Sequence, residues 1–168
     1  MKRRDFLATA AAAGAASLSA PAGAQQAKVV KFVPQADLAL LDPVFTTGLV
    51  TRNHGFLVYD QLYGLDDNFL PQPQMVEGHV IENDGKTWKL TLRDGLKFHD
   101  GTPVLARDAV ASINRWMQID AFGQTLRGVT EELSAISDKV IQFRLKKPFP
   151  LLPTALAKPS AFLSLIHI

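Results

Sequence analysis

Histidine and carboxylate side chains are the groups with which this chain of 168 residues could build a catalytic or metal site. The most suggestive pair is His99 and Asp100, which stand next to each other before Gly101. Adjacent residues in a turn point in different directions, and no third partner stands at a spacing that suits a metal site or a catalytic triad. His54 and His79 are isolated, and no hydrolase, zinc-protease or phosphate-loop motif occurs. We therefore interpret residues 99–101 as a structural turn, and we expect neither a catalytic residue nor a bound metal.

A small polar stretch is the better candidate for binding. Thr46, Thr47 and Gly48 precede a helix that the apolar spacing predicts from about Leu49 to Tyr63. The apolar positions of that helix are Val50, Leu57, Val58 and Leu62. The first N–H groups of a helix have no partner within it, so a small polar stretch at this point can face a ligand. The alternative interpretation is an ordinary threonine N-cap.

Two stretches of alternating apolar and polar residues predict β-hairpins. The first runs from Val80 to Leu92, and its turn contains Gly85, which tolerates the positive φ that tight turns require. The second joins residues 131–136 to residues 140–145. The side chains expected on the buried faces are Trp88, Leu90 and Leu92 in the first hairpin and Ile141, Phe143 and Leu145 in the second.

Helical spacing is clearest between the two hairpins. A helix is predicted from about Ala106 to Met117, with Leu105 at its N-cap, where it costs about 1 kcal/mol relative to Ser or Thr. Residues 121–127 are expected to form a short helix or a loop, and residues 151–157 to start another helix. Residues 28–33 are β-branched and aromatic and end at a proline, which predicts a short strand.

The first 24 residues have the three-part layout of a cleavable export signal. A basic start precedes an alanine-rich apolar run, and an A-x-A pattern predicts cleavage after residue 24. The start also resembles the twin-arginine motif R-R-x-F-L. The residues that carry both patterns are Arg3, Arg4, Phe6, Leu7, Ala22 and Ala24. The apolar run is shorter than the roughly 20 residues that span a bilayer, so we expect an exported protein without a transmembrane helix.

The formal charge of +2 depends on that segment. Residues 1–24 contain three basic residues and one acidic residue, and their removal leaves basic and acidic residues in equal number. A neutral mature chain gives no electrostatic reason to expect nucleic acid or an anionic membrane as a partner. The absence of cysteine excludes disulfides and thiolate chemistry.

The stretch LRDGLKFHDGTPVLARDAVASI, residues 92–113, carries a specific resemblance. Three further motifs precede it in the expected order: L-D-P at 41–43, Y-D-Q-L at 59–62 and D-G-K-T-W at 84–88. Together they resemble the family 5 extracellular solute-binding proteins, the dipeptide/oligopeptide-type periplasmic receptors of ABC importers. Gly78 and His79 stand where that family usually has Ser-Trp.

The resemblance implies an α/β fold, namely the N-terminal part of a two-lobed periplasmic-binding-protein fold with a β-rich α+β subdomain. Residues 25–66 would open the first lobe and residues 67–161 would form the smaller subdomain attached to it, with the second lobe absent. It also implies a monomeric periplasmic protein without a cofactor, which binds a small solute such as a peptide and delivers it to ABC permease subunits in the inner membrane. Within this chain, Thr46, Thr47 and Gly48 are the ligand contacts that we predict.

Two alternative hypotheses about function also fit the sequence. One is an exported hydrolase, although no set of nucleophile, base and orienting residue can be assembled. The other is a truncated fragment without activity, whose apolar surface lacks the segments that should cover it. The apolar end, Leu163–Ile168, resembles a translated sequencing adapter, so residues 162–168 are expected to be a non-native tail.

Overall fold

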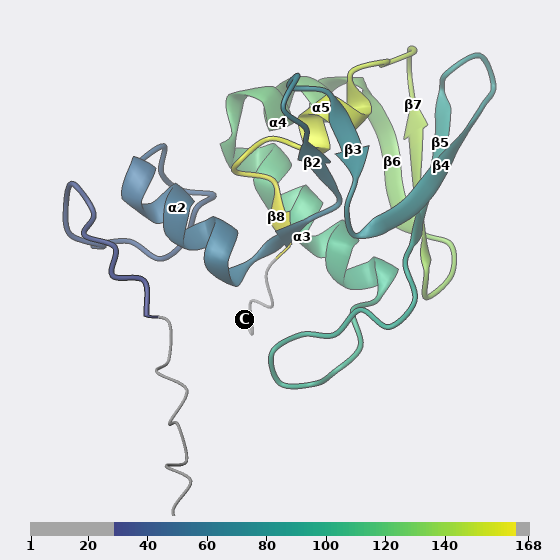
Figure 1. Ribbon diagram of the computed structural model, residues 1–168. Coiled ribbons are helices and arrows are strands. Elements are labelled where there is room, and N and C mark those ends of the chain that lie inside the picture. Colours follow the sequence, from purple (N-terminus) through teal and green to yellow (C-terminus); the bar gives the residue numbers. More distant parts are fainter. Residues whose placement is uncertain (1–28, 164–168) are drawn as a thin grey trace, which may run out of the picture. The chain divides into compact units, whose positions relative to one another are not determined.

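The computed structural model describes residues 29–163 (Figure 1). The chain divides into two units, residues 1–33 and residues 34–168, and the helices and strands of the described part belong to the second unit. In chain order these elements are α2 (Leu49–Val58), β1 (Asp60–Gln61), β2 (Tyr63–Leu65), β3 (Pro71–Pro73), β4 (Val76–Glu82), β5 (Thr87–Leu92), α3 (Ala106–Ile119), α4 (Ala121–Val129), β6 (Thr130–Ala135), β7 (Val140–Leu145), α5 (Leu152–Leu156) and β8 (Phe162–Leu163).

The main sheet has four antiparallel strands in the order β4-β5-β7-β6. Both predicted hairpins are confirmed, and the first begins at Val76 rather than at Val80. The turn between β4 and β5 holds its three central residues at positive φ, with 82° at Gly85. Every side chain predicted for the buried faces of β5 and β7 is buried, because alternation along each strand sends one set of residues to the core.

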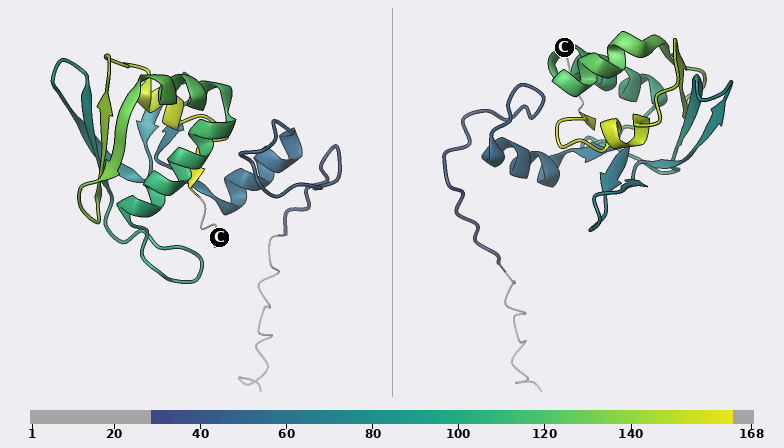
Figure 2. Two further views of the ribbon diagram at one scale, coloured as in Figure 1. Left: turned by 180° about the vertical axis from the view of Figure 1, so that it is seen from behind. Right: turned by 90° about the horizontal axis from the view of Figure 1, so that it is seen from above.

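Helices α3, α4 and α5 lie on one side of this sheet (Figure 2). The predicted helix at residues 106–117 is confirmed and continues to Ile119. Its N-cap, Leu105, contributes no capping bond of its own, but Asp108 Oδ2 accepts a hydrogen bond from the Leu105 N–H at 2.9 Å. Gly123 lets α4 pack closely against α3, since a Cβ there would lie 2.8 Å from the carbonyl oxygen of Trp116.

The long helix predicted from Leu49 to Tyr63 is wrong. Helix α2 ends at Val58, and the chain then becomes extended because β1 pairs with β8 and β2 pairs with β3. Strand pairing, with the nearby β3 and with β8 about 100 residues away, overrides the local helical period here. The predicted apolar stripe is wrong at Leu57, which is 84% exposed, whereas Leu62 is buried but lies beyond the end of α2. The residues that α2 itself buries are Thr51 and Gly55.

The strand predicted at residues 28–33 is wrong as well. Residues 29–33 form no strand, and Val30 is 91% exposed. A strand needs a neighbour for its N–H and C=O groups, and residues 29–33 pair with no strand of the described chain. The helices expected near residues 121–127 and 151–157 are present as α4 and α5.

Some of the predictions made at the two ends of the chain lie outside the described residues. These are the export-signal residues Arg3, Arg4, Phe6, Leu7, Ala22 and Ala24, and residues 164–168 of the expected tail. The first two residues of that tail, Phe162 and Leu163, are buried and form β8, opposite Gln61 and Asp60 of β1. Between residues 29 and 163, none of the helices has the length and apolar character needed to span a membrane.

Candidate functional site

A pocket of about 330 Å³ is formed by segments that are far apart in the sequence. One wall is the loop at residues 44–47 together with Arg52 of α2, and the other consists of the junction between α3 and α4 and of residues 158–160. Thr46 and Thr47 both line the pocket, whereas Gly48, the next residue and the N-cap of α2, is not part of the lining. The structure therefore places the polar stretch singled out in the sequence at a concave surface.

The loop that carries the two threonines has a defined local geometry. Thr46 Oγ1 accepts a hydrogen bond from the Gly48 N–H at 3.0 Å. No side chain caps α2, so the alternative interpretation of an ordinary threonine N-cap is wrong. Farther along, Thr51 is buried and its hydroxyl donates to the carbonyl oxygen of Leu40 at 2.7 Å. This bond ties the first turn of α2 to the segment that precedes the loop.

An ion pair between Asp42 and Arg115 fixes the loop to helix α3. The guanidinium of Arg115 donates to both carboxylate oxygens of Asp42 and also lies 4.9 Å from the ring centroid of Phe45. Burial alone would raise the pKa of Asp42, but the hydrogen bonds from Arg115 and from the Val44 N–H outweigh burial and lower it. Asp42 is therefore ionised at neutral pH, and the loop is held by a charge-assisted contact.

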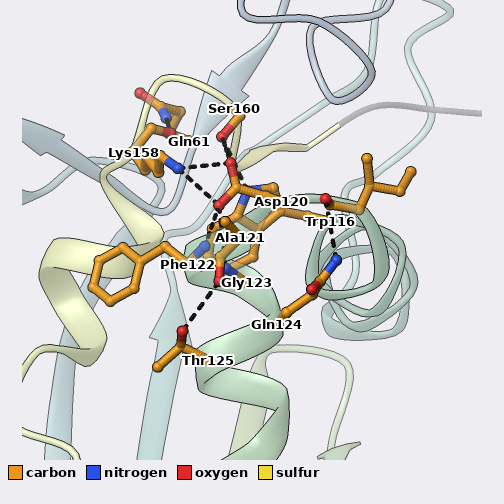
Figure 3. A network of polar contacts seen from close by, with 11 residues as sticks. Gln61, Trp116, Asp120, Ala121, Phe122, Gly123, Gln124, Thr125, Lys158 and Ser160 are labelled. Atoms are coloured by element: carbon orange, nitrogen blue, oxygen red, sulfur yellow. Dashed lines mark hydrogen bonds and ion pairs between the residues drawn. The ribbon is translucent and has the colours of Figure 1, made fainter.

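The opposite wall is organised by Asp120, the N-cap of α4 (Figure 3). Its Oδ1 accepts hydrogen bonds from the N–H groups of Phe122 and Gly123, at 2.8 and 3.2 Å. Lys158 Nζ donates to both carboxylate oxygens, at 2.8 and 2.7 Å, and Ser160 Oγ donates to Oδ2 at 2.9 Å. One carboxylate thus joins the start of α4 to the segment that follows α5.

Trp116 extends this network into the core. Its indole N–H donates to Ser160 Oγ at 3.1 Å, and its side chain is buried. Burial by itself would raise the pKa of Asp120, but the hydrogen bonds from Lys158, Ser160 and the two backbone N–H groups lower it. The Asp120 carboxylate is therefore charged at neutral pH and fully occupied by donors.

Two of the three histidines considered in the sequence, His99 and His79, lie in structural surroundings. His99 lies in a turn, as predicted, and Asp100 Oδ1 accepts hydrogen bonds from the N–H and the hydroxyl of Thr102, at 2.9 and 2.7 Å. His79 Nδ1 lies 2.8 Å from Tyr63 Oη. Within residues 29–163 no group of three or more His, Asp or Glu side chains is placed to hold a metal ion.

Sequence reasoning missed four residues of the site: Arg52, Asp120, Lys158 and Ser160. A signal for Asp120 was available, because Asp before a short helical pattern is a favoured N-cap. The pairing of Asp120 with Lys158 and Ser160 joins residues about 40 positions apart, and no local pattern encodes such a contact.

Comparison with known proteins identifies the family. Residues 71–165 match the bacterial extracellular solute-binding proteins, family 5, in the part of that family described as its middle. The chain belongs to this family. The resemblance noted in the sequence is thereby confirmed.

One curated relative is similar along nearly the whole chain. It is the probable peptide ABC transporter periplasmic-binding protein y4tO of Sinorhizobium fredii, which is 40% identical over 169 residues, covering 97% of this chain and 32% of the relative. The glutathione-binding protein GsiB of Salmonella typhi is 28% identical, over 89% of this chain and 30% of its own. The chain thus spans about a third of the length of the curated relatives it matches.

Solved structures show the same fold. The binding protein AgaA of A. tumefaciens R10, in complex with agropinic acid, matches 77% of this chain and 26% of its own, with a TM-score of 0.68 at 23% identity. The murein tripeptide binding protein MppA of Escherichia coli matches 74% of this chain and 28% of its own, with a TM-score of 0.65 at 25% identity. The predicted class, a mixed helix-and-sheet part of the periplasmic-binding-protein fold, is confirmed.

Proposed function

We propose that this chain belongs to an exported receptor that captures a small solute, above all a peptide, and delivers it to the permease subunits of an ABC importer. The observation that carries the proposal is the 40% identity to a probable peptide-binding receptor, which extends over 97% of this chain. Membership of the solute-binding family supports it independently. Because the family and the matched structures are binding proteins, we propose binding without catalytic turnover and without a bound cofactor.

The ligand-contacting surface that we propose is the pocket beside Thr46 and Thr47. Both threonines line it, and their hydroxyls can donate to or accept from a polar ligand. Gly48 contributes by shaping the loop, since its N–H bonds to Thr46 Oγ1. Concave surfaces that combine apolar walls with a few polar groups are the usual form of a small-molecule site.

We further propose the route and the organisation of the protein. The first 24 residues would serve as a twin-arginine-type signal cut after Ala24, which would give a monomeric periplasmic protein. Residues 25–66 would open the first lobe, and residues 67–161 would form its smaller subdomain. Phe162 and Leu163, the first residues of the expected tail, pair with β1.

Thermal-shift and calorimetric screening of the protein purified from its own gene tests solute capture. Peptide, sugar and metal-chelate libraries should contain a ligand that raises the melting temperature. Thr47→Val, which keeps the side-chain shape and removes the hydroxyl, should weaken binding of that ligand. Thr91→Val on β5, outside the pocket, should leave binding unchanged. If no library member shifted the melting temperature, solute capture would be rejected. Equal effects of the two substitutions would reject the site.

A further inference from the structure

The pocket beside Thr46 and Thr47 carries an unbalanced positive charge. Two of its lining residues, Arg52 and Lys158, are cations, and one, Asp120, is an anion. Lys158 donates to both oxygens of Asp120, so these two charges offset each other. Arg52 makes no ion pair and no side-chain hydrogen bond with any residue from 29 to 163.

Asp120 has no capacity left for Arg52. Its carboxylate already accepts from two backbone N–H groups, from Lys158 and from Ser160. A carboxylate offers about four lone-pair sites, and these donors occupy them. Asp120 is also the one carboxylate that lines the pocket within the described chain, so Arg52 faces the pocket without a counter-charge.

The rest of the pocket lining is suited to an organic ligand with an apolar group rather than to a bare ion. Val44, Phe45, Ile119 and Pro159 contribute apolar surface to the lining. Arginine binds carboxylates with two parallel hydrogen bonds, which gives it geometric selectivity as well as attraction. A carboxylate attached to an apolar group could therefore pair with Arg52 while the apolar group packs against the apolar lining residues.

We infer that this pocket binds the carboxylate of an organic solute, with Arg52 as the counter-charge and the apolar walls around the attached side chain. The inference rests on the proposed function and narrows the class of solute. A ligand that presented only an ammonium group here would meet Arg52 and no uncommitted carboxylate in the lining. For a peptide, the end that enters this pocket is accordingly its carboxyl end or an acidic side chain.

A matched pair of probes tests the charge requirement directly. N-acetyl-leucine carries a carboxylate beside an apolar side chain, and N-acetyl-leucinamide has the same shape without the charge. Nuclear magnetic resonance of the two indole N–H groups can follow binding to the protein purified from its own gene. Trp116 bonds to Ser160 in the pocket wall, whereas Trp88 bonds to the carbonyl oxygen of Gly85 outside the lining.

We expect N-acetyl-leucine to move the Trp116 indole resonance and to leave that of Trp88 in place. The amide should bind at least about tenfold more weakly, as expected when a charge-assisted hydrogen bond is lost. Arg52→Gln should reduce binding of the acid by a similar factor and should leave the amide unaffected. Arg107→Gln is the control, because it removes the same charge from an α3 side chain that is 76% exposed and outside the pocket lining.

Three results would overturn the inference while solute capture stood. The first is that the amide binds as tightly as the acid. The second is that Arg52→Gln and Arg107→Gln weaken binding of the acid equally, which would indicate a general effect of net charge. The third is the absence of binding by N-acetyl-leucine in a protein that does bind a ligand from the peptide, sugar or metal-chelate libraries. Failure of every ligand in those libraries would instead reject the proposed function.

Discussion

Replacing Asp120 with alanine should destabilise the protein by about 2.5–3 kcal/mol. Loss of the N-cap of α4 contributes about 1 kcal/mol. Loss of the hydrogen bond from Ser160, whose hydroxyl also accepts from Trp116, contributes about 1 kcal/mol more. The ion pair with Lys158 adds about 0.5–1 kcal/mol, a modest value because the Lys158 side chain is 38% exposed and is partly screened by water.

Asp120→Asn separates the cap from the charge. The asparagine oxygen can still accept from the N–H groups of Phe122 and Gly123, because Asn caps helices as well as Asp does. The neutral amide loses the attraction to Lys158. We expect Asp120→Asn to cost about half as much as Asp120→Ala, as measured by the shift in urea midpoint at constant slope.

The same carboxylate predicts a pH dependence with a definite sign. The pKa of Asp120 is lower in the folded protein than its usual value of 3.8, so the unfolded chain takes up the proton first as the pH falls. The stabilisation is therefore complete above about pH 4 to 5 and is lost as the pH falls through the folded pKa. The difference between wild type and Asp120→Ala should shrink below pH 4. A cost below about 0.5 kcal/mol at pH 7, the range of ordinary surface changes, would refute this account of the network.

Three further sets of substitutions should change the stability of the protein in a defined direction. In urea unfolding, Gly123→Ala should destabilise the protein by about 1–3 kcal/mol, because the new Cβ would lie 2.8 Å from the backbone of Trp116. Gly128→Ala, on the same helix but with open space around it, should stabilise the protein by about 0.5–1 kcal/mol. Equal effects of the two substitutions would contradict the close packing of α4 against α3. Burial raises the pKa of Tyr63 from 10.0 to about 12, so the wild type should lose stability as the pH rises from 10 towards 12, and Tyr63→Phe should show no such loss in alkaline denaturation curves. Leu105→Ser should raise the thermal midpoint, by the equivalent of about 1 kcal/mol, because serine can cap α3 where leucine cannot, and an unchanged midpoint would show that the lost leucine contacts cancel the cap.

Local patterns predicted those elements whose partners are close in the sequence. The hairpins around Gly85 and around residues 137–139 follow from alternation and turn chemistry, which act over a few residues. Helix α3 follows from a strong apolar period that the sheet then buries. The extended segment after Val58 could not be predicted in this way, because β1 is specified by a strand about 100 residues later.

The same difference between local patterns and long-range contacts applies to the residues of the pocket. Thr46 and Thr47 were identified from their position before a helix, and both line the pocket. The facing wall was missed, because Asp120 meets Lys158 and Ser160 only after α5 has brought residues 158–160 back to the start of α4. Helix period and turn chemistry carry no information about a pairing of that kind.

Helix α3, whose first half belongs to the family-like stretch at residues 92–113, connects the two walls of the pocket. Residues 92–113 supply the loop and the first half of α3, and the last turns of that helix follow directly. Arg115 reaches Asp42, which lies just before the threonine loop, and Trp116 reaches Ser160 in the opposite wall. Adjacent residues of one helix therefore position both walls. The two side chains leave α3 in different directions, and neither lines the pocket itself. Because both contacts come from one helix, a shift of α3 would move the two walls together.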